Sequence, residues 1–106
     1  MNAELITATQ GVCTAITELA KTFRVRRSVR KEELIKLSAQ LKALEYMVRA
    51  QAIGAALRAN IAEIAQTYRY ISQQNMTGPA LEMAMEHLRL LGELLQNNIK
   101  MMFPAF

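Results

Sequence analysis

Aspartate is absent from this sequence of 106 residues, and cysteine and histidine occur once each, as Cys13 and His87. A chain without aspartate holds neither a Ser-His-Asp triad nor the aspartate-based magnesium sites of phosphoryl transfer. It also lacks a glycine-rich loop of the kind that cradles phosphates. We therefore expect a protein that is not an enzyme and that holds no cofactor.

Glycine occurs only four times and proline only twice, and no Asn-Gly or Asp-Gly pair marks a β-hairpin. The chain is dominated by residues that lose little on entering a helix, namely Ala, Leu, Glu, Gln, Arg, Met and Lys. These two observations predict an all-α fold. The length predicts a single domain over residues 1–106.

Long hydrophobic runs are missing too. The longest uncharged apolar stretch, residues 5–17, is shorter than the roughly 18 to 20 apolar residues that a membrane span requires. Glu4 stands where a secretory signal would carry basic residues. One cysteine forms no intrachain disulfide and agrees with a reducing compartment, so we expect a cytoplasmic protein without a transmembrane segment.

Apolar residues recur at intervals of three and four, which predicts amphipathic helices over about 3–23, 29–74 and 79–102. Ser28 is the expected N-cap of the second helix, and Pro79 is suited to the first turn of the third. The predicted buried stripes comprise Leu5, Val12, Ile16, Leu19 and Phe23; Leu34, Leu37, Leu41, Leu44 and Val48; Leu57, Ile61, Ile64, Tyr68 and Ile71; and Leu81, Met85, Leu88, Leu91, Leu95 and Met102.

The central segment decides the architecture. Its apolar seam shifts by one residue near Gly54, about 100° around a helix, because Val48 and Ile61 are 13 residues apart and two heptads would need 14. An isolated glycine costs a helix only about 1 kcal/mol relative to alanine, which favours a continuous helix over residues 29–74. Such a helix would be about 69 Å long, far more than the ~26 Å diameter of a compact domain of this size.

We therefore expect three helices with a long central one, whose exposed apolar stripes a second copy would cover in an elongated helical-bundle homodimer. The alternative is a monomeric four-helix up-and-down bundle, in which the central segment breaks at Gly54.

A basic cluster occupies residues 21–31 (KTFRVRRSVRK) and contains six of the thirteen basic residues and no acid. Seven basic residues and all nine glutamates remain outside it, so this cluster alone makes the chain positive at +4. Its members are Lys21, Arg24, Arg26, Arg27, Arg30 and Lys31. The predicted helix boundary places the cluster across a turn.

Four interpretations of the basic cluster compete. Several guanidinium groups on one side of a helix suit successive phosphates of DNA or RNA. They equally suit an acidic protein partner, or, together with Phe23, Val25 and Val29, weak contact with an anionic membrane surface. In the fourth interpretation the cluster is only a solvated helix junction.

Three smaller constellations are open to a functional or an ordinary structural interpretation. Tyr68, Arg69 and Tyr70 could stack on bases, although Tyr68 already belongs to an apolar stripe. Glu82, Glu86 and His87 resemble a metal face, but Glu86 and His87 point about 100° apart on a helix, so we expect no metal site. Cys13 among apolar neighbours is expected to be a small buried side chain and not a nucleophile.

The last segment is rich in methionine and ends in Phe103-Pro104-Ala105-Phe106, where Phe103 and Phe106 form a candidate docking tail. Taken together, the sequence predicts a non-catalytic helical assembly, adaptor or regulatory protein that acts through protein contacts. The alternative is a small basic nucleic-acid-binding protein that uses the cluster at residues 21–31.

Overall fold

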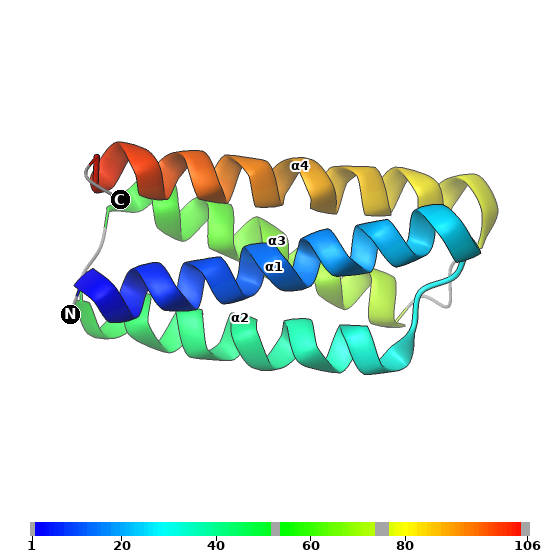
Figure 1. Ribbon diagram of the computed structural model, residues 1–106, viewed down its shortest axis with the longest axis horizontal. Helices are drawn as coiled ribbons and strands as arrows, with labels where there is room; N and C mark the ends of the chain where they lie inside the picture. Colours follow the sequence, from blue (N-terminus) through cyan, green and yellow to red (C-terminus); the bar gives the residue numbers. More distant parts are fainter. Residues whose placement is uncertain (1, 52–53, 74–76, 105–106) are drawn as a thin grey trace.

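Four α-helices follow one another in the computed structural model, which describes residues 2–51, 54–73 and 77–104. They are α1 (Asn2–Arg26), α2 (Lys31–Gln51), α3 (Ala55–Gln73) and α4 (Gly78–Met102). Each helix runs back along the one before it, and α1 also packs against α4, which closes an up-and-down bundle (Figure 1). The predicted all-α class is confirmed, and the described part of the chain contains no strand.

The predicted continuous helix over residues 29–74 is wrong. Helix α2 ends at Gln51, Gly54 is not helical, and α3 begins at Ala55. The shift of the apolar seam explains the break, because a straight helix would point its two halves in different directions. Folding back at this point lets both halves face one core.

The bundle measures 39 × 23 × 21 Å with a radius of gyration of 13.5 Å, so the expected long rod is absent. The four-helix up-and-down arrangement, which the sequence analysis gave as the alternative, is the observed one. The elongated homodimer was predicted to cover the stripes of that rod, and this reason for a second copy is removed because the stripes pack against one another within one chain.

The predicted apolar stripes form the core with few exceptions. Leu34 and Tyr68 are half-buried at its margin, and Met102 is 40% exposed, so its predicted place in the core is wrong. Ile99, four residues after Leu95, is fully buried instead and ends the stripe of α4 one turn earlier. The buried side chains common to prediction and structure are Leu5, Val12, Ile16, Leu19, Phe23, Leu37, Leu41, Leu44, Val48, Leu57, Ile61, Ile64, Ile71, Leu81, Met85, Leu88, Leu91 and Leu95.

The turn between α1 and α2 lies slightly later than predicted. Helix α1 continues to Arg26 and is closed by Arg27, whose backbone is left-handed at φ 57° and whose N–H donates to the Phe23 carbonyl at 2.7 Å. The N–H groups of Glu33 and Leu34 donate to the Arg30 carbonyl, so Ser28 is not the N-cap. The start of α4 at Gly78-Pro79 agrees with the prediction. None of the helices in the described ranges is both long and apolar enough to cross a membrane.

Candidate functional site

The basic cluster lies at one end of the bundle, over the last two turns of α1, the connection to α2 and the first residue of α2. All six of its basic side chains are exposed. The cluster does straddle a turn, as predicted, but its members point to different sides. Lys21, Arg24 and Arg27 line the seam between α1 and α4, whereas Arg26, Arg30 and Lys31 do not line that seam.

Acidic residues of α4 lie beside the three basic residues that line the α1–α4 seam. Arg27 Nη1 lies 2.7 Å from Glu82 Oε1. Next along α4, the Arg89 guanidinium bonds the carboxylates of Glu86, at 2.5 Å and 3.0 Å, and Glu93, at 2.6 Å. A local excess of positive charge early in the sequence is thus partly balanced by glutamates of the last helix.

The pKa of the Glu86 carboxyl is lowered, first by its hydrogen bond from Arg89 and also by the charges of Arg89 and Arg24. The same pairing raises the pKa of Arg89 further. The glutamates are exposed and Arg89 is only half-buried, so solvent screens their attraction and each pair stabilises the fold only modestly. The α1–α4 seam is a network of solvated charges around Arg89.

Two of the three apolar side chains that the membrane-surface interpretation requires at the surface are not exposed. Phe23 is buried in the core, and Val29 is half-buried and packs against it. Only Val25, at 79% exposure, is left at the surface beside the basic side chains. One exposed valine adds little apolar area to a polybasic contact.

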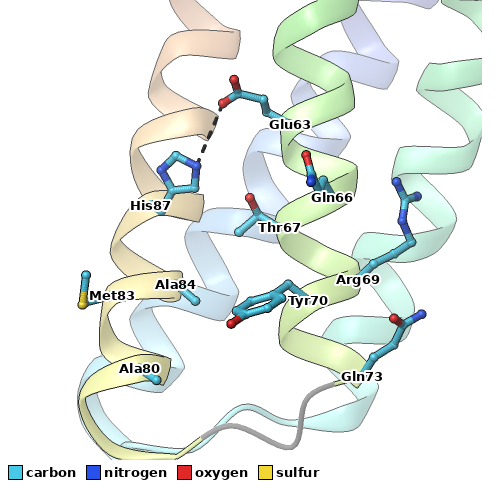
Figure 2. A pocket seen from close by; sticks show the side chains of 10 residues that line it. All are labelled: Glu63, Gln66, Thr67, Arg69, Tyr70, Gln73, Ala80, Met83, Ala84 and His87. Carbon is cyan, nitrogen blue, oxygen red and sulfur yellow. Dashed lines mark ion pairs between the residues drawn. The ribbon is translucent and has the colours of Figure 1, made fainter.

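Cys13 and His87 lie on different sides of α4. The Cys13 thiol faces α4 from α1 and donates a long hydrogen bond of 3.7 Å to the Gly92 carbonyl. Burial raises the pKa of Cys13 to about 11, so the thiol is protonated at neutral pH. His87 Nε2 lies 4.0 Å from Glu63 Oε2 of α3 (Figure 2). A thiolate and base pair is therefore not assembled.

The suggested metal face of Glu82, Glu86 and His87 is also not assembled, because the two glutamates face arginines at the α1–α4 seam while His87 faces α3. Across residues 2–51, 54–73 and 77–104, no group of three His, Cys, Asp or Glu side chains is placed to hold a metal ion.

A groove of about 910 Å³ lies between the second half of α3 and the first half of α4. Figure 2 shows the Tyr70 ring directed from α3 towards α4, with Met83 on the outer side of α4 and Arg69 extending away from α4. Tyr68 is half-buried and packs against the core. Tyr68 is thus separated from Arg69 and Tyr70, which both line the groove, and only Tyr70 presents an open aromatic face there.

Helix α4 carries a second apolar row that the sequence analysis missed. We call it the α4 stripe, and it consists of Met83, Leu90, Leu94 and Met101, which are 74%, 49%, 47% and 81% exposed. Successive members lie two turns, one turn and two turns apart, which places them on one side of the helix, opposite its buried face. The spacing of these four residues was visible in the sequence as a second apolar row beside the core stripe. The sequence analysis assigned only one apolar face to this helix.

Phe103, the first residue of the candidate docking tail, belongs to the margin of the core. It is half-buried, packs against the buried side chains and donates its N–H to the Ile99 carbonyl at 2.9 Å. Phe106 lies outside the described residues. Phe103 therefore closes the end of α4 and is not free to dock elsewhere while it stays in this position.

The fold and these surfaces define the chain as an antiparallel four-helix bundle with an exposed apolar row on its last helix and a divided basic cluster at one end. Comparison with protein-family models, with curated proteins and with solved structures finds no match. Any function must therefore be argued from the surfaces themselves.

Proposed function

We propose that this protein is a non-catalytic helical adaptor or assembly protein, and that its α4 stripe is the surface that binds a protein partner. The observation that carries the proposal is the alignment of four large, exposed apolar side chains along about 27 Å of one helix. Apolar side chains scattered singly over a surface need no explanation, whereas several aligned on one side of a helix indicate an interaction site.

The spacing of the stripe indicates the kind of partner. Steps of one and two helical turns match the positions at which one helix packs along another, so a partner helix would lie along α4. The remaining exposed large apolar side chains of the described chain do not extend this row. They are Val25, Ile35, Tyr46, Tyr70 and Met102, and they belong to all four helices.

Two features support a non-catalytic role. The only cysteine is protonated at neutral pH because burial raises its pKa, so it is a poor nucleophile. The only histidine faces an exposed glutamate at 4.0 Å, and no hydroxyl or thiol of the described residues is hydrogen-bonded to it. A cytoplasmic location is part of the same proposal, and the free thiol of Cys13 agrees with it.

The test compares three proteins in affinity capture from a lysate of the source organism. One is the wild type, the second carries L90E and L94E, and the third carries V25E and I35E as a control with equal added charge at exposed apolar sites outside the α4 stripe. We expect proteins that the wild type and the control retain in equal amounts and that the stripe variant loses. Equal retention by all three folded proteins, as judged by circular dichroism, would refute the proposal.

A second candidate function is binding of nucleic acid through the other half of the basic cluster. One observation favours it: Arg26, Arg30 and Lys31 are exposed and form no ion pair with the described residues. Guanidinium and ammonium groups in this state are available to phosphates.

A salt titration with random duplex DNA or RNA tests this candidate. Binding that weakens as salt rises, and that is lost in R26Q/R30Q/K31Q but kept in K36Q/K42Q/K100Q, would support it, because both variants remove three charges. Absence of binding at low salt would exclude it.

A further inference from the structure

The α4 stripe has the same residue types and spacings in both directions along the helix. Leu90 and Leu94 lie two residues on either side of position 92, and Met83 and Met101 lie nine residues on either side of it. Two polar residues fill the gaps with the same symmetry, because His87 and Asn97 each lie five residues from position 92. The full row therefore alternates steps of four and three, the pattern of a helix that packs along another helix.

From this symmetry we infer that the partner of the α4 stripe is a second copy of this chain, packed antiparallel about a two-fold axis at the level of Gly92. This inference rests on the proposed function and names the partner of the same surface. A two-fold axis requires one patch to be complementary to itself, with each contact made twice. In this arrangement Leu90 faces Leu94 of the second copy, and Met83 faces Met101.

Charge along one edge of the stripe fits the same arrangement. Glu86, Arg89 and Glu93 follow the side of α4 that faces α1, and Arg89 already bonds both glutamates. Lys100 comes two helical turns after Glu93 and therefore continues the same row. Antiparallel packing places Lys100 of one copy beside Glu86 of the other, at both ends of the contact. It also places the two Glu93 residues near the axis, with one Arg89 on each side of them.

A parallel arrangement lacks this complementarity. It would set the charged edge of one copy against the opposite edge of the other, where Ala80, Ala84 and His87 face α3, so Lys100 would not meet Glu86. Opposite charges that meet favour association, and this gain would be lost. Antiparallel packing also sets His87 of one copy at the level of Asn97 of the other, so the two polar interruptions of the row coincide.

Sedimentation over a concentration series tests the inference. We expect the wild type to rise from the chain mass of 11.9 kDa to twice that value as its concentration increases. L90E/L94E is expected to weaken association at least about tenfold, because it removes four apolar side chains from the seam of the dimer. V25E/I35E is the matched control and should associate like the wild type.

Cross-linking then tests the direction of packing. In a C13A background, M83C and M101C are treated separately and as a mixture with a short bismaleimide. Two copies of residue 83 in an antiparallel pair are about 27 Å apart along the helix axis, whereas residues 83 and 101 face each other. We expect cross-linked dimers from the mixture and none from either variant alone.

Three results would overturn the inference: a wild type that remains at 11.9 kDa throughout the series, association that L90E/L94E leaves unchanged, or cross-linking of M83C with itself. The first of these would leave the proposed function standing if lysate proteins are still captured through the stripe. If no lysate protein is captured through the stripe but M83C and M101C still cross-link in the antiparallel direction, the role of this surface is self-association. The two experiments therefore separate failure of the inference from failure of the proposed function.

Discussion

The Asn60 side-chain amide donates a hydrogen bond of 3.2 Å to the main-chain carbonyl oxygen of Leu91, and so joins α3 to α4 inside the bundle. Asn60 is 4% exposed, one of two buried polar side chains in the described structure. The side-chain oxygen Oδ1 of Asn60 in turn accepts a hydrogen bond of 3.0 Å from the Asn98 side-chain amide. A polar group buried at a helix interface stabilises the register in which its partners meet, because any other register leaves it unpaired.

Replacing Asn60 tests this function of the hydrogen bonds. N60A removes both bonds and leaves a small cavity, so we expect a loss of about 1–2 kcal/mol in the free energy of unfolding. N60D is expected to cost more, about 3 kcal/mol at pH 7, because a buried carboxylate oxygen would face the Leu91 carbonyl with no proton between them. Urea denaturation followed by circular dichroism measures both values.

The N60D variant should also respond to pH. Burial would raise the pKa of the new carboxyl in the folded state above its unfolded value. The folded state then binds the proton more tightly, so the penalty is full above the folded pKa and falls as the pH decreases towards the unfolded value. N60A carries no titratable group and is the control. Equal pH dependence of the two variants would show that residue 60 is not buried against Leu91.

The sequence predicted the core well because packing periodicity is local information. A stripe such as Leu37, Leu41 and Leu44 indicates which side of a helix is buried, whichever helix packs against it. The break near Gly54 was visible as a shift of the seam, but the low cost of one glycine in a helix was given too much weight. Burying two stripes against one core offsets far more than about 1 kcal/mol of local preference.

The surfaces were harder to predict because they depend on which helices become neighbours. The pairing of Arg27 with Glu82 joins the first helix to the last, and no local pattern predicts it. The α4 stripe had a readable spacing, but a row beside the correctly predicted core stripe can either pack against a neighbouring helix or stay exposed. The packing of α4 against α1 and α3 buries Leu88 and leaves Leu90 exposed.

Close approach between α1 and α4 at Gly92 provides another prediction. A Cβ on Gly92 would lie 3.1 Å from the Cγ2 atom of Ile16, which is buried and has little room to move. We expect G92V to lower the free energy of unfolding by about 2 kcal/mol through overpacking.

Gly11 is the matched control for this prediction, because it is also a helical glycine with a close neighbour. That neighbour is the end of the exposed and flexible Gln40 side chain, which can turn away. G11A is therefore expected to gain up to about 1 kcal/mol from higher helix propensity. Thermal unfolding of both variants checks the opposite signs, and a stabilised G92V would contradict the close packing.

Arg27 combines a left-handed backbone with an exposed ion pair, and two substitutions separate these effects. R27Q keeps the backbone strain and removes the ion pair with Glu82, so we expect a loss of at most about 1 kcal/mol. R27G removes the same pair but also relieves the left-handed conformation, which costs a residue with a Cβ about 1 kcal/mol. R27G should therefore be the more stable variant by about 1 kcal/mol in chemical denaturation. A less stable R27G would show that this turn is not left-handed in solution.

Cys13 gives the last prediction, on reactivity. Because burial raises its pKa to about 11, the thiolate fraction at pH 8 is about one in a thousand, compared with about a quarter for a free cysteine of pKa ~8.5. Only the thiolate reacts with iodoacetamide, so we expect alkylation of the folded protein to be at least about a hundredfold slower than in denaturant. Between pH 7.5 and 9.5 the rate should rise tenfold per pH unit without levelling off. A plateau near pH 9, in protein that circular dichroism shows to be folded, would mean that the thiol is not desolvated against Gly92 and that the α1–α4 seam is more open than the structure describes.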